Sequence, residues 1–250
     1  MSVNPLGSVH AGRVQSASPQ PCAKCGSRVA GICASLDVAG LDDMSHDTRR
    51  TPVAPRHVLF REGDDATHVV MLMRGTAKLS RQMPDGKQQV LGFRFDGDIL
   101  GFTSGKQFIA DAEMLTDGSV CRVSRRDFEA MLARYPSMQR RMIDLCMQEL
   151  ERTQEQLVTV GRRQAEQRVA AFLLSLAAAQ RMRGQNPQVF DMPMTRAEIG
   201  DLLGLALETV SRAFSALRRR ALVREPGGNR VELPRMEALQ ALAEGEPVDV

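Results

Sequence analysis

Three cysteines lie within twelve residues near the start of the chain, in the segment CAKCGSRVAGIC; they are Cys22, Cys25 and Cys33. Thiolates are soft ligands, so cysteines at this spacing are typical of a site for zinc or for an iron–sulfur cluster. Either site normally takes four protein ligands, and one is missing locally. The candidates for the fourth are two distant cysteines and two histidines: Cys121, Cys146, His10 and His46.

The uneven grouping of the cysteines favours a cluster over zinc. A zinc site typically has a second close pair of ligands, such as C-x-x-C or H-x-x-x-H, and no such pair follows the first three cysteines. Three neighbouring cysteines and a distant fourth fit an iron–sulfur cluster better. The spacing leaves open the alternative of a cysteine segment that binds no metal.

A second patterned stretch covers residues 195–220, TRAEIGDLLGLALETVSRAFSALRRR. Thr195 and Glu198 match the S/T-x-x-E capping box, which predicts the start of a helix. Gly204 then separates two sets of apolar residues at helical spacing: Ile199, Leu202 and Leu203 before it, and Val210, Phe214 and Leu217 after it. Two short helices around a tight glycine turn predict a helix-turn-helix, whose second helix lies in the DNA major groove.

Four polar residues open this second predicted helix: Glu208, Thr209, Ser211 and Arg212. Arg212 can donate two hydrogen bonds to guanine, and Glu208 can accept one from the cytosine amino group. Ser211 can act as donor or acceptor. These residues therefore form a set that can read bases. An ordinary helical hairpin with a solvated outer face is the plain alternative.

The residues that flank the predicted helix pair favour the interpretation that it binds DNA. Residues 221–223 and 230–233 enclose the turn PGGN, which predicts a two-stranded wing. Residues 181–235 hold ten arginines, six acids and no lysine. Such a local excess of cations supplies sequence-independent attraction to DNA phosphates.

Length and composition limit the class of protein. At 250 residues and a net charge of +3, the chain can hold two domains and a connector, and its basicity is local. It has no apolar run near twenty residues and no apolar signal core, so we expect a cytoplasmic protein without a membrane partner. We find no Ser/His/Asp or Cys/His constellation, P-loop or dinucleotide motif, so we do not expect an enzyme.

The first 135 residues divide into three predicted regions. We expect a flexible tail at residues 1–20 and a cysteine-rich sensor segment at residues 21–50. Short apolar runs at 57–60, 69–72, 77–80, 89–93 and 120–123 alternate with glycine turns. This pattern predicts an N-terminal β-roll, or jelly roll, over residues 51–135, which can hold a ligand or serve only as a core.

A long helix is predicted over residues 136–161, ahead of a winged helix-turn-helix domain at 162–250. Its narrow apolar seam consists of Cys146, Leu150, Thr153, Leu157 and Val160. A seam of this width indicates coiled-coil pairing with a second copy, and reading two DNA half-sites requires a dimer. Packing of the helix on its own roll is the alternative. The predicted fold class is α+β.

The order of these parts resembles the cyclic-AMP receptor protein superfamily from about residue 22 to residue 243. Within it, the sequence is similar to the FNR branch of anaerobic regulators. That branch carries an N-terminal cysteine cluster, one cysteine inside the cyclic-nucleotide-binding-like roll, and a recognition helix of the form E-x-x-S-R. The matching residues here are Cys22, Cys25, Cys33, Cys121 and the run Glu208, Thr209, Val210, Ser211, Arg212.

The resemblance implies that the four cysteines ligate a [4Fe–4S] cluster, which favours the dimer and is lost to oxygen. It also implies that Glu208, Ser211 and Arg212 read a palindrome of TTGAT-type half-sites in promoters of low-oxygen genes. RNA polymerase would then be a partner, contacted by a roll turn that the turn with Asp85 and Gly86 resembles. Cys146 matches no ligand of the family and is assigned to the seam.

Cyclic nucleotide is not expected as the ligand. Relatives that bind it have Gly-Glu and Arg-Ser or Arg-Thr in the phosphate-binding cassette, and the matching stretch here reads Gly101-Phe102 and Asp111-Ala112. We expect the Asp111 carboxylate to repel a cyclic phosphate.

Two departures from the family pattern affect the expected switch. The interval between Cys25 and Cys33 is longer than in familiar members, which bears on cluster stability. Thr153 stands where the best-known regulator has an aspartate on the seam, and a threonine pair does not repel. We therefore expect the protein to dimerise more readily without its cluster. The alternative function is a regulator of the same family with structural zinc or no metal, which senses nitric oxide or a small molecule.

Overall fold

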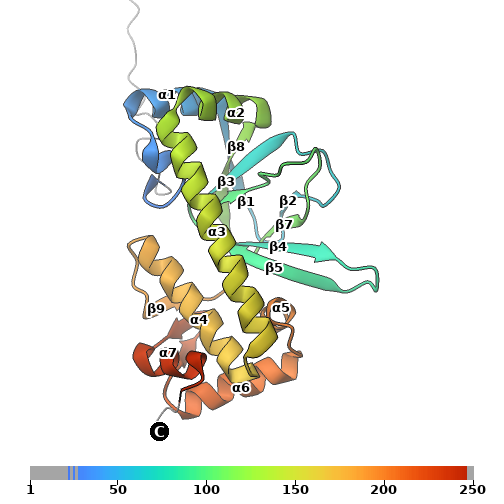
Figure 1. Ribbon diagram of the computed structural model, residues 1–250, viewed down its shortest axis with the longest axis vertical. Helices are drawn as coiled ribbons and strands as arrows, with labels where there is room; N and C mark the ends of the chain where they lie inside the picture. Colours follow the sequence, from blue (N-terminus) through green and yellow to red (C-terminus); the bar gives the residue numbers. More distant parts are fainter. Residues whose placement is uncertain (1–21, 23–24, 26–27, 247–250) are drawn as a thin grey trace, which may run out of the picture.

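The structure of the protein, a computed structural model, describes Cys22, Cys25 and residues 28–246 (Figure 1). The predicted tail at residues 1–20 lies outside the described residues. A β-roll and the cysteine segment lie beside one end of a long helix, and a helical domain with a small sheet lies at the other end. This is the predicted α+β fold. None of the helices in the described part of the chain combines the length and the apolar character that a membrane span requires.

The β-roll consists of two four-stranded antiparallel sheets. The first has the strand order β1 (Thr48–Val53), β8 (Gly118–Ser124), β3 (His68–Arg74), β6 (Ile99–Leu100). The second has the order β2 (Val58–Phe60), β7 (Asp111–Met114), β4 (Ala77–Gln82), β5 (Gln88–Arg94). Side chains from both sheets bury one shared apolar core that includes Leu72, Leu100, Met114 and Val120.

Strands β1, β6 and β7 were not predicted from the sequence. β1 has the sequence TRRTPV, whose charged and exposed residues give no hydrophobic alternation. It forms because its backbone pairs with β8, placing Arg50 directly opposite Cys121. The other two strands are only two and four residues long and carry too short a pattern to recognise.

Helices cover the cysteine end of the roll. The short 3-10 helix η2 (Ile32–Ser35) and helix α1 (Val38–Asp47) lead into β1, and α2 (Arg125–Arg134) follows β8. Helix α3 (Pro136–Arg162) then runs the length of the molecule (Figure 1). Pro136 occupies its first turn, where a missing backbone N–H costs nothing.

The C-terminal domain contains four helices and a three-stranded sheet among its described residues. The helices are α4 (Ala165–Met182), α5 (Arg196–Leu203), α6 (Leu207–Arg219) and α7 (Met236–Glu244). The sheet has the strand order β10 (Arg224–Gly227), β11 (Arg230–Glu232), β9 (Val189–Asp191). Val169, Leu173, Phe214 and Leu217 are almost fully buried in its core.

The predicted wing is present but shifted in sequence. Its first strand is β10, and the predicted strand at residues 221–223 is wrong. Ala221 has a φ of 53°, which turns the chain away from the end of α6, and Leu222 and Val223 then enter the core. Strand β9 adds a third member that sequence reasoning missed.

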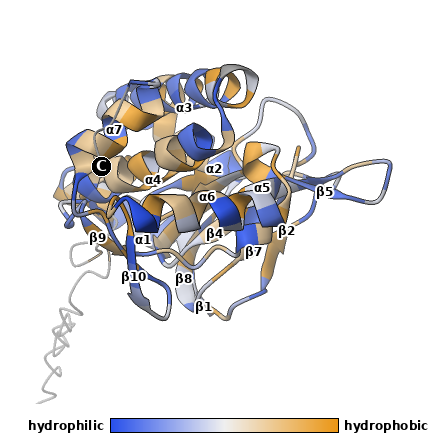
Figure 2. Cartoon of the chain, turned by 90° about the horizontal axis from the view of Figure 1, so that it is seen from below, coloured by the Kyte–Doolittle hydropathy of each residue, from blue (hydrophilic) through white to orange (hydrophobic). Residues whose placement is uncertain are grey.

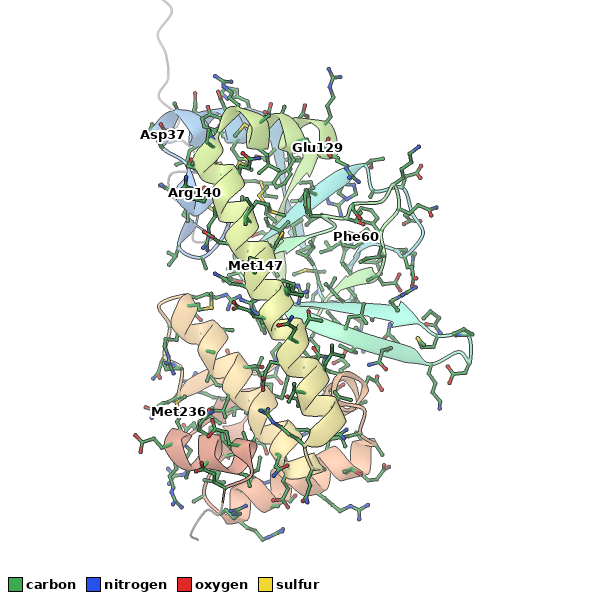
Figure 3. All side chains as sticks on the ribbon, viewed as in Figure 1. Asp37, Phe60, Glu129, Arg140, Met147 and Met236 are labelled. Carbon is green, nitrogen blue, oxygen red and sulfur yellow. The ribbon has the colours of Figure 1, made fainter. Side chains whose placement is uncertain are left out.

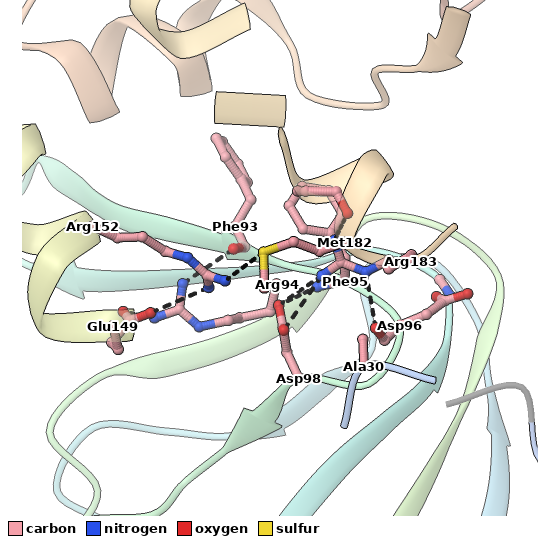
Figure 4. Close-up of polar contacts among 12 residues, drawn as sticks. Ala30, Phe93, Arg94, Phe95, Asp96, Asp98, Glu149, Arg152, Met182 and Arg183 are labelled. Carbon is pink, nitrogen blue, oxygen red and sulfur yellow. Dashed lines mark hydrogen bonds and ion pairs between the residues drawn. The ribbon is translucent and has the colours of Figure 1, made fainter. Parts of the chain in front are cut away.

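The roll and the C-terminal domain touch through polar and apolar contacts. Val90 and Phe93 of β5 belong to the apolar core of the C-terminal domain. Arg183, after α4, pairs with Asp98 of the roll at 3.3 Å and lies over the ring of Phe95 (Figure 4). Lys78 of β4 is buried and pairs with Glu198 of α5 at 3.0 Å. These pairs join the two domains within one chain.

Candidate cysteine site and DNA-binding surface

The four cysteines of the predicted ligand set come together beside α3. Cys22 and Cys121 are buried, and Cys25 and Cys33 are partly buried. Cys22, Cys33 and Cys121 share an apolar cluster with Ile32 and other residues of the roll and α3. Cys146 is exposed on α3, so it stands apart from the buried thiols. The structure thus gathers residues that are about ninety positions apart in the sequence.

The environments of Cys33 and Cys121 favour their protonated, neutral form. Burial, followed by the proximity of Cys22, Cys121 and Cys25, raises the pKa of Cys33 to about 12. Burial also raises the pKa of Cys121, although a hydrogen bond with the Thr48 side chain opposes that rise. A ligand that binds here must therefore displace thiol protons and supply positive charge in their place.

The loop that carries the cysteines is held against α3. The Arg141 side chain, on α3, donates hydrogen bonds to the backbone oxygens of Ala30 and Gly31. Gly31 also packs tightly against Gly97 of the roll, where a side chain would come within 3.0 Å of the Gly31 nitrogen. Ile32, Met138 and Met142 belong to the same apolar cluster, and η2 packs against α3. These contacts hold the cysteine loop against the N-terminal half of α3.

The described side chains include no group of three or more metal-ligating residues placed around a single ion. Four sulfurs around one zinc lie about 3.8 Å apart, as follows from Zn–S bonds of about 2.3 Å at tetrahedral angles. In a four-iron cluster each sulfur binds a different iron, so the sulfurs stand farther apart. A cluster in place of zinc therefore stays a prediction.

The recognition helix α6 is positioned by the turn that precedes it. Thr195 and Glu198 form the predicted capping box at the start of α5, which confirms that expectation. Gly204 ends α5 with a φ of 64°, a backbone conformation that favours glycine. Gly200 lets the turn pack closely on α5, since a side chain there would lie 2.5 Å from the backbone oxygen of Leu205 in that turn.

The predicted base-reading residues lie on the outer side of α6. Glu208, Ser211 and Arg212 are exposed, whereas Val210 and Phe214 on the other face are buried. Thr209 is only partly exposed and borders a hollow that also includes Arg212 and the start of α4. Because no hydrogen bond or ion pair to another described residue engages the side chains of Glu208 and Arg212, both charges are available to an external partner.

Other arginines of this domain are engaged by the protein itself. Arg218 pairs with Glu225 at 2.5 Å, and Arg196 pairs with the same carboxylate. The Arg196 guanidinium also lies 3.3 Å from the ring centroid of Phe214. These contacts fix α6 against the wing, whose strand β10 is coloured hydrophilic in Figure 2. The domain therefore separates structural arginines from the unengaged Arg212.

The predicted seam of α3 is mostly exposed. Leu150 is 48% and Leu157 is 70% exposed, and Cys146 and Thr153 are exposed beside them. Val160 is partly buried next to Gly204 of its own chain. The predicted seam did not include the exposed residues Ile143 and Met147, which continue it toward the start of α3; Figure 3 labels Met147. A four- and three-residue step from Ile143 through Met147 to Leu150 could have revealed them.

The turn proposed to touch polymerase lies at the tip of the β4–β5 hairpin, which projects from the body of the protein (Figure 1). Asp85 and Gly86 are exposed there. The Asp85 carboxylate accepts a hydrogen bond from the Lys87 N–H at 3.1 Å, and Gly86 has a φ of 82°. The turn is therefore accessible and has a defined shape.

A cavity of about 300 Å³ lies between the roll and α3. Its apolar lining includes Phe60, Phe102, Phe108 and Ile109. Asp111 does not line it, and the Asp111 carboxylate instead accepts the N–H of Glu62 at 2.8 Å. The repulsion of a cyclic phosphate by Asp111 therefore stays a prediction. The absence of a cyclic nucleotide stays a prediction.

Two family models match separate parts of this arrangement. The model of the Crp-like helix-turn-helix domain matches residues 167–242, which contain α5, α6 and the wing. The model of the cyclic nucleotide-binding domain matches residues 50–135, which contain the roll.

Known relatives cover nearly the whole chain. The transcriptional activatory protein AadR of Rhodopseudomonas palustris is 37% identical over 220 residues, which cover 87% of this chain and 92% of that protein. The nitrogen fixation regulation protein FixK of Bradyrhizobium diazoefficiens is 33% identical, covering 88% and 94%. The solved structure of FixK2 from Bradyrhizobium japonicum matches with a TM-score of 0.72 at 27% identity, covering 81% of this chain and 99% of that one. The chain therefore belongs to the cyclic-AMP receptor protein/FNR (CRP/FNR) family of DNA-binding transcriptional regulators, which are not enzymes.

Proposed function

We propose that this protein is an oxygen-responsive transcriptional activator of the cytoplasm that holds a [4Fe–4S] cluster. Cys22, Cys25, Cys33 and Cys121 would ligate the cluster, whose bound iron supplies the positive charge that stabilises four thiolates and is open to oxidation by oxygen. The observation that carries the proposal is the gathering of these four thiols, since Cys22, Cys33 and Cys121 share one apolar cluster with residues of α3 and Cys25 lies close to Cys33.

The packing of the cysteine loop suggests how the site controls dimerisation. The loop packs on α3 through η2, whose Ile32 shares an apolar cluster with Met138, and it accepts the hydrogen bonds from Arg141. Ligation of Cys22, Cys25 and Cys33 fixes this loop, and loss of ligation frees it. A loop that holds α3 in the dimer-competent arrangement shifts the population toward the dimer, by a coupling of about 1–3 kcal/mol.

The exposed seam supports a homodimer formed along α3. Ile143, Met147, Leu150 and Leu157 present apolar surface that a monomer leaves in water. Pairing of two copies buries this surface, and the gain is about 25 cal/mol per Å² of apolar area. Two α6 helices are then available for two half-sites of a palindromic promoter, with RNA polymerase contacted through the turn at Asp85 and Gly86.

The DNA sites proposed are TTGAT-type half-sites. Arg212 would donate to guanine, Glu208 would accept from cytosine, and Ser211 would adapt to its neighbour. The exposure of all three side chains and the absence of partners for Glu208 and Arg212 among the described residues support this assignment.

The decisive experiment measures iron, zinc and acid-labile sulfide in protein purified without oxygen. About four irons and four sulfides per chain, lost on exposure to air, are expected. Zinc without sulfide would contradict the oxygen-sensing part and leave the DNA-binding part intact. In that case the apolar cavity of about 300 Å³ favours the second candidate function, a regulator that responds to a small molecule bound in the roll.

Thr153 bears on whether the protein dimerises without its cluster. The Thr153 side chain carries no charge that would repel the Thr153 of a second copy. Its hydroxyl donates a hydrogen bond to the backbone oxygen of Glu149 in its own helix at 2.8 Å. We expect the apo protein to remain partly dimeric at micromolar concentration. Sizing by analytical ultracentrifugation tests this, and a purely monomeric apo protein would contradict it. Leu150→Glu, which places like charges in the seam, is expected to give the monomer in the same assay.

A further inference from the structure

A cation lies against the cysteine site. The Arg50 side chain, on β1, donates a hydrogen bond from Nη2 to the Sγ atom of Cys22 at 3.4 Å. Arg50 also stands directly opposite Cys121 in the pairing of β1 with β8. Directly paired residues on neighbouring antiparallel strands project to the same face of the sheet, so this guanidinium is on the face that carries the Cys121 thiol.

The strand supplies a second polar group to the same site. Thr48 lies two residues before Arg50 and therefore on the same face of β1, and its side chain hydrogen-bonds Cys121. Arg49, between them, projects to the opposite face. β1 thus contributes two polar contacts to two of the four sulfurs, although its own sequence gives no sign of a metal site.

Charge gives these contacts their significance. Four thiolates around a [4Fe–4S] core leave the complete site with a net negative charge, which is costly to hold in an apolar surrounding. The site is apolar, because Ile32, Leu36 and Met142 pack around the cysteines. A guanidinium on a ligand sulfur offsets that charge, and hydrogen bonds to charged groups are stronger than those between neutral groups.

We propose that Arg50 is a positioning residue of the cysteine site, which orients Cys22 and compensates the negative charge of the bound cluster through its hydrogen bond to the Cys22 sulfur. This inference rests on the proposed function. It assigns a role to a residue outside the cysteine motif, and that role determines how readily the cluster is oxidised. Loss of the cation makes electron removal easier, because both the net charge and the hydrogen bonds at the sulfurs set the reduction potential.

The test compares Arg50→Gln with Arg49→Gln. Both variants remove one positive charge from β1, but only the first removes the group that contacts Cys22. Each protein is purified without oxygen and assayed for iron and sulfide. The reduction potential is then measured by spectroscopic titration, and the rate of cluster loss in air is followed by absorbance. Arg50→Lys is added because it restores the charge without the planar donor geometry.

For Arg50→Gln we expect a lower reduction potential and loss of the cluster in air about threefold to tenfold faster than in the wild type, on the scale of one partly exposed charge-assisted hydrogen bond. Arg49→Gln should match the wild type, and Arg50→Lys should lie between the two. Equal potentials and equal decay rates in all four proteins would overturn the inference alone. Wild-type protein without labile sulfide would overturn the proposed function, and the inference with it.

Discussion

The cysteine site and the outer face of α6 lie at opposite ends of the molecule and handle charge in opposite ways (Figure 1). At the cysteine site, burial raises the pKa of Cys121 and raises the pKa of Cys33 to about 12, which favours the neutral form of both thiols. On α6, Glu208 and Arg212 are exposed and remain without partners among the described residues. A small, positively charged ligand must be enclosed to be held, whereas a surface for a polyanion must keep its charges hydrated until the partner arrives.

Two structural connections join these regions: helix α3, and the ion pairs between the roll and the C-terminal domain. The cysteine loop contacts the N-terminal half of α3, and the C-terminal half of α3 leads into the C-terminal domain. The Lys78–Glu198 and Arg183–Asp98 pairs give a second connection, from the roll to that domain. Changes at either region therefore test whether its function is local or is transmitted.

The largest effect is expected at the cysteine site. Replacement of a soft thiolate by a hydroxyl in Cys121→Ser should remove most of the iron and labile sulfide from anaerobically purified protein. Cys146→Ser is the matched control, because Cys146 is exposed on α3 and stands apart from the site. Iron retained by Cys121→Ser and lost by Cys146→Ser would contradict the assignment of the fourth ligand.

An intermediate effect is expected on α6. Arg212→Ala should weaken binding to a matched site by about 1–3 kcal/mol and relax specificity at one base pair, since a bidentate contact to guanine is lost. Arg218→Ala is the control, because the Arg218 guanidinium is already paired with Glu225. Binding isotherms on matched and single-substituted sites separate the two cases. Equal loss of affinity on every sequence would make Arg212 a phosphate contact.

The smallest effect is expected at the contact between the domains. Burial alone would raise the pKa of Glu198, but hydrogen bonds from Thr195 and Lys78 lower it below its ordinary value. Stability from this group is therefore present above the ordinary carboxyl pKa and is lost as the pH falls through the lowered value. Glu198→Gln should cost about 1 kcal/mol at neutral pH, with a smaller difference in acid.

Denaturant unfolding as a function of pH measures this difference. Glu237→Gln, at an exposed position in the first turn of α7, is the control for loss of one carboxylate near a helix start. A constant gap between Glu198→Gln and the wild type across the acid range would show that the carboxylate charge contributes nothing.

Local patterns were sufficient where neighbouring residues decide the structure. The capping box at Thr195, the turn at Gly204 and the apolar face of α6 depend on contacts within about twenty residues, and all were predicted. The wing was misplaced by three residues because burial of Leu222 and Val223 in the domain core overrides their strand propensity.

The sequence by itself determined the order of the parts, the helix-turn-helix and the residue types of both functional regions, since these follow from periodicity, capping and ligand chemistry. The tertiary structure alone decided that Cys121 meets the N-terminal cysteines, that Arg50 reaches Cys22 and that Arg212 is unpaired while Arg218 is not. Those facts depend on sheet register and on packing between residues far apart in the chain. No local pattern encodes them, because each is fixed only when the whole fold brings its partners together.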